Sequence, residues 1–245
     1  MASLTIFHTN DFHNRIDEPK AARLRALKDT NPDSLLLDAG DAIWAGNVFV
    51  RPGGEPALRL MNAAGYDAMA LGNREFHFLA SGLRGKLGWA EFPVLCANIR
   101  PTRQDTKSPV VPFITKLIAG LRIAVFGLTV AMITERMLSR KVSAHVFDDP
   151  IAVAGKLVPE LRAEYDLVIA LTHIGLKEDR RLAETVPGID LIVGGHTHAV
   201  LESPETVKGC AIVQAGWYGH SVGRVDMTVE QGEVRVSGRL MELRI

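Results

Sequence analysis

Short apolar runs alternate with amphipathic segments along most of the chain. Runs such as SLLLD (34–38) have the length and composition of buried strands, whereas residues 19–29 place Leu24 and Leu27 on one face of a helix. On these patterns we predict strands at 4–7, 34–38, 67–71, 92–98, 166–171 and 190–195. We predict helices at 19–29 and 55–65, in part of 74–90, and from Asp148 through Tyr165.

Turn residues mark where several of these elements begin or end. Gly65 follows the second predicted helix as a C-terminal cap, and Pro150 stands at an early position of the fourth. Two strand-like runs flank Ala119 and Gly120, which predicts a hairpin. The final part of the chain has the pattern of strands and turns. Alternating strands and helices that give way to hairpins indicate one α/β domain over residues 1–245.

Composition limits the class of protein. Hydrophobic residues make up 47% of the chain and charged residues 23%, which suits a substantial core. Lysine plus arginine and aspartate plus glutamate number 28 each, and this zero net charge argues against a protein that binds long nucleic acid through its backbone. Cys96 and Cys210 lack metal-type spacing, so we expect free thiols in a reducing compartment.

The N-terminus and the lengths of the apolar runs favour a soluble, cytoplasmic protein. The segment MASLTIFHTNDFH has no basic flank and only a short apolar run, so we do not expect a signal peptide. No apolar stretch approaches the ~18 residues that a membrane helix needs. We therefore expect no membrane partner.

Five predicted strands run directly into residues that can bind a metal or a phosphate. In open α/β sheets, ligands bind at the carboxyl ends of the strands, so we expect side chains at these ends to lie close together. The residues concerned are Asp11 and His13, then Asp41, Asn73 and His173, and finally His196 and His198.

Each of these residues alone has a simpler interpretation. Asp11 or Asp41 could belong to an ordinary turn, and His173 could be a satisfied histidine at a strand end. The pair His196 and His198 is more specific, because two imidazoles spaced two residues apart in a glycine-rich loop can serve neighbouring metal ions. Repetition of such residues at five strand ends favours a shared site.

The order and spacing of these residues resemble the calcineurin-like metallophosphoesterases, specifically the catalytic domain of the 5′-nucleotidase branch. The matching segments are TNDFHNR (9–15), GDAIWAG (40–46), NAAGYDAMALGNREF (62–76), THIGL (172–176), GGHTH (194–198) and QAGWYGHSVGRVDM (214–227). The resemblance covers essentially the whole chain. It implies an α/β fold of four layers, an α/β/β/α sandwich of two mixed β-sheets with helices outside, and a two-metal phosphoesterase centre.

The resemblance implies two metal sites that share one ligand. One metal would be held by Asp11, His13, Asp41 and His198, and the other by Asp41, Asn73, His173 and His196. Two carboxylates do not neutralise two divalent ions, so such a centre attracts a phosphate group and lowers the pKa of a bridging water to give a hydroxide nucleophile. Four imidazoles beside carboxylates favour two divalent transition metal ions (Mn, Fe, Co, Ni or Zn) over Mg or Ca.

The resemblance is confined to the catalytic domain. Family 5′-nucleotidases normally carry a second domain, which supplies an aromatic pair that stacks on the nucleobase. We therefore expect the substrate of the present chain to be selected by local loops, such as residues 42–54 and 129–147, or by a partner.

The segment ALGNREFHF (70–78) departs from the family pattern. Family 5′-nucleotidases have Gly-Asn-His-Glu-Phe-Asp, where the His helps to protonate the leaving oxygen and the Asp orients it; here Arg74 and His77 stand at those positions. Arginine cannot deliver a proton, but its guanidinium matches a pair of phosphoryl oxygens. The same branch includes the UDP-diacylglucosamine hydrolases, which have Gly-Asn-Arg-Asp in this loop and cleave a pyrophosphate bond.

We therefore expect Arg74 to be catalytic as a charge clamp, and His77 either to supply a proton or to orient Arg74. The alternative is that both are surface residues of a degraded site. Taken together, the sequence predicts a metal-dependent phosphohydrolase that cleaves a phosphoester or pyrophosphate bond of a small molecule such as a nucleotide. Two alternatives are a catalytically weak, metal-binding regulatory module, which retention of all seven metal positions disfavours, and a nuclease or phosphodiesterase, which zero net charge disfavours.

Overall fold

Two six-stranded sheets form the centre of the computed structural model, which describes residues 2–46 and 48–243. The first sheet contains, in order, β14 (Glu233–Glu242), β13 (Ser221–Glu230), β1 (Ala2–Thr9), β2 (Ser34–Asp38), β3 (Ala68–Ala70) and β4 (Val94–Leu95). Strands β1 to β4 are parallel, β13 pairs antiparallel with β1, and β14 pairs antiparallel with β13.

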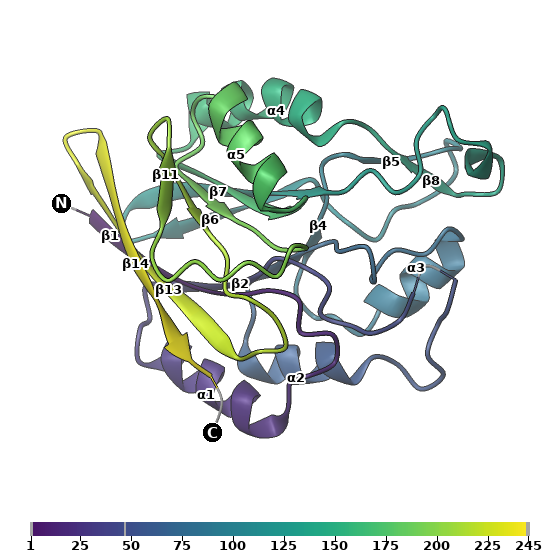
Figure 1. Cartoon of the computed structure of the whole chain (residues 1–245), viewed down its shortest axis with the longest axis horizontal. Coiled ribbons are helices and arrows are strands. Elements are labelled where there is room, and N and C mark those ends of the chain that lie inside the picture. The colour runs from purple at the N-terminus through teal and green to yellow at the C-terminus, as the bar shows by residue number, and fades with distance from the viewer. Residues whose placement is uncertain (1, 47, 244–245) are drawn as a thin grey trace.

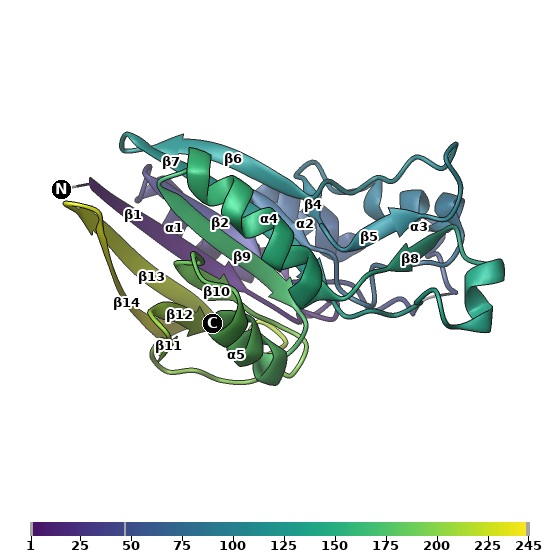
Figure 2. The same ribbon diagram turned by 90° about the horizontal axis from the view of Figure 1, so that it is seen from above.

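The second sheet is also mixed. It contains, in order, β11 (Glu205–Val207), β12 (Cys210–Val213), β10 (Leu191–Val193), β9 (Leu167–His173), β7 (Leu121–Thr129) and β6 (Phe113–Ile118). The four central strands are parallel, whereas β6 and β11 at the edges are antiparallel to their neighbours. A separate antiparallel pair, β5 (Ile99–Pro101) with β8 (His145–Phe147), extends away from the sheets beside η1 (Leu138–Lys141) (Figure 2).

Helices cover the outer face of each sheet. α1 (Glu18–Asp29) and α2 (Pro56–Ala64) lie against the first sheet, and α4 (Pro150–Glu164) and α5 (Leu176–Thr185) lie against the second (Figure 1). α3 (Ala80–Leu87) packs through Leu83 and Leu87 into the same outer core as α2. The predicted four-layer α/β/β/α arrangement is confirmed. Among the described residues, no helix has both the length and the apolar character to cross a membrane.

Alternation of side chains along each strand divides the core into three layers. In β1, Leu4 and Ile6 face the space between the sheets, whereas Phe7 faces the helices on the other side. In β9, Ile169 likewise faces the central layer while Val168 faces α4 and α5. Because the strands are buried on both faces, they appear in the sequence as continuous apolar runs rather than as alternating patterns.

Most predicted turns and caps are confirmed. The hairpin between β6 and β7 turns at Ala119 and Gly120, which have φ angles of 50° and 81°. Gly65 ends α2 in the left-handed conformation, with φ of 80°. Asp149 caps α4 by accepting a hydrogen bond from the backbone N–H of Ala152 at 2.8 Å.

Two segments differ from the prediction. The helix α5 was not predicted; it is amphipathic, but it is short and mostly polar, and it buries only Asp179, Leu182 and Ala183. The strand predicted at 92–98 is a regular strand only over Val94–Leu95. The helix predicted in part of 74–90 is confirmed as α3, which begins only at Ala80 because side-chain hydrogen bonds hold the preceding residues in a loop.

Candidate metal centre

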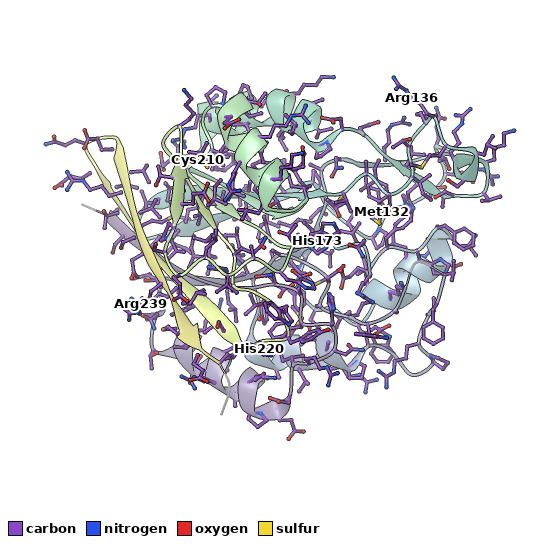
Figure 3. The ribbon with its side chains drawn as sticks, in the orientation of Figure 1. Met132, Arg136, His173, Cys210, His220 and Arg239 are labelled. Atoms are coloured by element: carbon purple, nitrogen blue, oxygen red, sulfur yellow. The ribbon has the colours of Figure 1, made fainter. Side chains whose placement is uncertain are left out.

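Loops from both sheets meet at one end of the sandwich. His173, the last residue of β9, lies at this meeting point near the centre of the molecule (Figure 3). The backbone N–H of His196 donates to Asp11 Oδ2 at 2.9 Å, which joins the loop after β10 to the loop after β1. The close approach of the loop after β10 to the loop after β2 requires glycine at position 195, because a Cβ there would lie 2.8 Å from Ala39 O. All seven predicted metal ligands are brought together here.

The first group of ligands surrounds Asp11. Asp11 Oδ1 lies 3.5 Å from His13 Nε2 and 3.3 Å from His198 Nε2. Both Asp11 Oδ1 and His13 Nε2 are buried without a hydrogen-bond partner among the described residues. Buried polar atoms are rarely left unpaired, and a cation between these atoms would satisfy both.

The second group surrounds Asn73. Asn73 Oδ1 lies 3.2 Å from His173 Nε2 and 3.1 Å from His196 Nδ1. His173 Nδ1 donates a hydrogen bond to Ala39 O at 2.7 Å, so in the neutral ring Nε2 carries the lone pair. A backbone carbonyl that fixes the imidazole in this way is a common support for a metal ligand.

Asp41 lies between the two groups and contacts both. Its Oδ2 is 3.5 Å from His13 Nε2, and its Oδ1 is 3.4 Å from His173 Nε2. One oxygen therefore faces each group, which is the arrangement that the sequence resemblance implies for a bridging carboxylate. The oxygen and nitrogen donors of both groups fit divalent transition metal ions.

Backbone strain is concentrated at these residues. Five of the seven predicted ligands have φ in the left-handed region: Asp11 at 53°, His13 at 48°, Asp41 at 55°, His196 at 75° and His198 at 56°. This region is uncommon for residues other than glycine and persists only where the surrounding structure enforces it. The loops are therefore held in a shape that aims their side chains at one point.

The charges of the site are strongly coupled. Burial opposes ionisation of Asp41, but His173 and His13 hold the pKa of its carboxyl well below the usual range. Burial also opposes protonation of His173, but Asp41 and Asp11 raise the pKa of its imidazole to about 9. Without metal, a proton on His173 thus balances the carboxylates, and metal binding has to displace it.

Glu75 holds the loops after β2 and β3 together. Its fully buried carboxylate accepts hydrogen bonds from the backbone N–H groups of Asp41 at 2.9 Å, Gly72 at 2.9 Å and Ile43 at 3.1 Å. Burial, with a further contribution from Asp41, raises the pKa of Glu75 to about 7. Glu75 was not among the predicted site residues, although it stands within the matching segment at 62–76.

Lys86, a residue of α3, also holds the loops of the site together. The side chain is fully buried, and its ammonium donates to the carbonyl oxygens of Gly46 at 2.7 Å, Arg74 at 2.7 Å and Phe76 at 2.9 Å. The helix thereby fixes the two loops that carry Asp41 and Asn73. No sequence pattern distinguishes Lys86 from a surface lysine, so it was not predicted.

We expect Lys86→Met to destabilise the protein by about 3–5 kcal/mol, because three buried carbonyl groups lose a charged donor. Urea unfolding followed by circular dichroism would measure this free energy. Lys177→Met on the exposed face of α5 is the matched control and should change stability by less than about 0.5 kcal/mol. If Lys86→Met were destabilised no more than the control, the conclusion that Lys86 fixes the two loops would be wrong.

Arg74 lies at the rim of the centre. Its backbone N–H donates to Asp41 Oδ1 at 2.8 Å, and its Nε is 3.5 Å from Asp41 Oδ2. Its Nη1 donates to Trp44 O at 3.0 Å, and the guanidinium stacks 4.9 Å from the Trp44 ring centroid. With its side chain 29% exposed, Arg74 can meet a ligand at the centre, as a charge clamp requires.

His77 is held by its own segment rather than by the ligands. It precedes α3, its Nδ1 accepts a hydrogen bond from the N–H of Leu79 at 3.0 Å, and its ring stacks on Phe78 and contacts Gly82. Burial and the nearby Lys86 lower the pKa of the His77 imidazole. Because α3 begins only at Ala80, His77 lies in the loop before the helix, and its catalytic role stays a prediction.

Comparison with known proteins agrees with this geometry. Residues 4–200 match the calcineurin-like phosphoesterase family. The chain is 34% identical to a 5′-nucleotidase from Vibrio vulnificus, over 95% of this chain and 50% of that protein. It is 32% identical to the trifunctional nucleotide phosphoesterase protein YfkN from Bacillus subtilis, over 93% of this chain and 18% of that protein.

Solved structures show the same fold. The crystal structure of a 5′-nucleotidase precursor from Thermus thermophilus superposes with a TM-score of 0.84 at 28% identity, over 98% of this chain and 54% of that one. The chain thus spans half or less of the length of these curated relatives. The match over most of the chain, together with the clustered aspartate, asparagine and histidine residues, shows that the chain belongs to the calcineurin-like phosphoesterase family.

Proposed function

We propose that the chain is a metal-dependent hydrolase that cleaves a phosphoester or pyrophosphate bond of a small molecule such as a nucleotide. The observation that carries the proposal is the position of Asp41, whose two carboxylate oxygens face two separate groups of donor atoms. A carboxylate in that position suits two metal ions held side by side. The names of the similar proteins, 5′-nucleotidase and nucleotide phosphoesterase, support the choice of substrate class.

Two divalent ions at this centre would supply Lewis acidity and an activated water for attack on phosphorus. The chain's own residues have three further tasks. Glu75 and Lys86 fix the loops, so that the ligands need little rearrangement when substrate binds. Arg74 would neutralise charge on the phosphoryl oxygens of the substrate. His173 keeps its Nε2 aimed at the centre through its hydrogen bond to Ala39.

Metal analysis combined with a substrate panel tests this proposal. Protein purified without chelator is expected to contain about two transition metal ions per chain, and with added Mn²⁺ to hydrolyse a chromogenic phosphate ester. The panel contains a monoester, a diester and single-stranded DNA. Cleavage of DNA as fast as the small esters would indicate a nuclease, and bound metal with no turnover of any substrate would indicate a regulatory module. Either outcome would contradict the proposal.

A further inference from the structure

Gln214 is a fully buried polar residue that the proposed mechanism does not use. It directly follows β12, and its side chain contacts the loop after β10, which carries two of the metal ligands. Its Oε1 accepts hydrogen bonds from the N–H of Ala199 at 2.5 Å and the hydroxyl of Thr197 at 3.1 Å. Its Nε2 donates to Gly195 O at 2.8 Å. Two donors at the oxygen and a carbonyl at the nitrogen fix the orientation of this amide, which therefore holds three residues of the loop.

The residues that Gln214 holds alternate with the metal ligands of the loop. Thr197 and Ala199 stand on either side of His198, and the same amide oxygen binds both of them. His198 has φ of 56°, in the left-handed region. A residue other than glycine keeps this conformation only where the surrounding structure enforces it. The Gln214 amide supplies that constraint on both sides of His198.

The second group of ligands has supports that do not depend on Gln214. His196 is also flanked by residues that the amide holds, but its own backbone N–H is bound to Asp11 Oδ2 at 2.9 Å. His173 is the last residue of β9, and a backbone carbonyl fixes its imidazole. Loss of the Gln214 amide should therefore disturb His198, in the first group, more than either of these histidines.

We propose that Gln214 is a positioning residue of the metal centre, which holds His198 in place and thereby raises the affinity of the first group of ligands for metal. The inference rests on the two-metal centre of the proposed function. Removal of groups that orient a metal ligand commonly lowers metal affinity about 10–100-fold. Loss of this amide should weaken the binding of one ion by such a factor and leave the other ion bound as before.

The metal affinity of Gln214→Met tests this role. Methionine is similar in length and adaptable in shape, and it removes all three hydrogen bonds of the amide. Dissociation constants for Zn²⁺ are measured by competition with a chromogenic chelator, without substrate. We expect the variant to bind one ion as tightly as the wild type and the other about 10–100-fold more weakly. Gln104→Met, at an exposed position, is the matched control and should bind both ions like the wild type.

Double variants assign the effect to His198. In a His198→Ala protein, Gln214→Met should cause no further loss of affinity, because the ligand that the amide positions is already absent. In a His173→Ala protein, which lacks a ligand of the second group, the same change should still weaken the first-group ion about 10–100-fold. A general disturbance of the site would instead lower affinity to a similar extent in both proteins.

The outcomes distinguish this role from the proposed function. Circular dichroism without metal shows whether Gln214→Met folds. If it does not, Thr197→Val removes the hydroxyl that donates to Gln214 and should weaken the same ion by a smaller factor. Wild-type affinities in the variant that folds, or equal losses in the two histidine variants, would overturn the positioning role and leave the phosphohydrolase intact. Binding of no ion by wild-type protein would overturn the two-metal centre itself.

Discussion

Asp41→Ala is expected to abolish phosphate ester hydrolysis and to release at least one metal ion per chain. The wild-type carboxylate presents one oxygen to His13 and the other to His173, so its removal takes a ligand from both groups at once. Residues that act as a unit in catalysis commonly cost a thousandfold or more when one is lost, and we expect a decrease in kcat of at least about 10³. Elemental analysis and a steady-state assay measure the two effects.

Asp41→Asn is the control for this experiment. Asparagine tolerates the left-handed φ of 55° at this position and can still accept the hydrogen bond from the N–H of Arg74 through one oxygen. It should therefore fold normally by circular dichroism while binding metal less tightly, because it lacks the charge that a bridge needs. An Asp41→Ala protein that keeps two ions at full occupancy would refute the assignment of Asp41.

The second large effect concerns the leaving group. Because Arg74 cannot donate a proton, expulsion of an alkoxide loses an acid assistance commonly worth about 10²–10⁴-fold. A nitrophenolate, or the phosphate released from a pyrophosphate bond, needs no such assistance. We therefore expect kcat/KM to fall steeply as the pKa of the leaving group rises, more steeply than in a relative with histidine at this position. A series of aryl and alkyl phosphates gives the slope.

Variants of the same loop sharpen this prediction. Arg74→Ala should slow every substrate, because the guanidinium beside Asp41 no longer stabilises the phosphoryl group. Arg74→His, combined with His77→Asp, should selectively restore alkyl monoesters. The second change is needed because the wild-type His77 ring is held by Leu79 and Phe78 rather than by residue 74. A flat dependence on leaving-group pKa in the wild type would mean that another residue donates the proton.

The residue pattern alone predicted the α/β class and the set of residues that converge, whereas the four layers followed from the resemblance to a known family. Parallel strands buried on both faces leave continuous apolar runs, and polar residues at their ends must share one edge of the sandwich. The supports of the site could not be predicted. Glu75 binds the N–H of Asp41, a residue 34 positions away, and Lys86 binds the carbonyl of Gly46, 40 positions away. Such long-range contacts leave no local pattern. The left-handed φ angles of His13 and His198 could not be predicted either, because these positions hold histidine and not the glycine that usually marks such a conformation.

The contact between Gly195 and Ala39 has a consequence for the choice of ion. The ligands of the centre come from both sheets, and their separation is limited by how closely these two loops approach. Packing at residue 195, which offers no donor atom, would therefore set how far apart the ligands stand around a bound ion. A side chain at residue 195 would push Ala39 and His173 apart. The metal ligands would then be more widely spaced and would favour larger ions over smaller ones. Metal selectivity in this protein could thus change through substitution of a residue that contributes no donor atom.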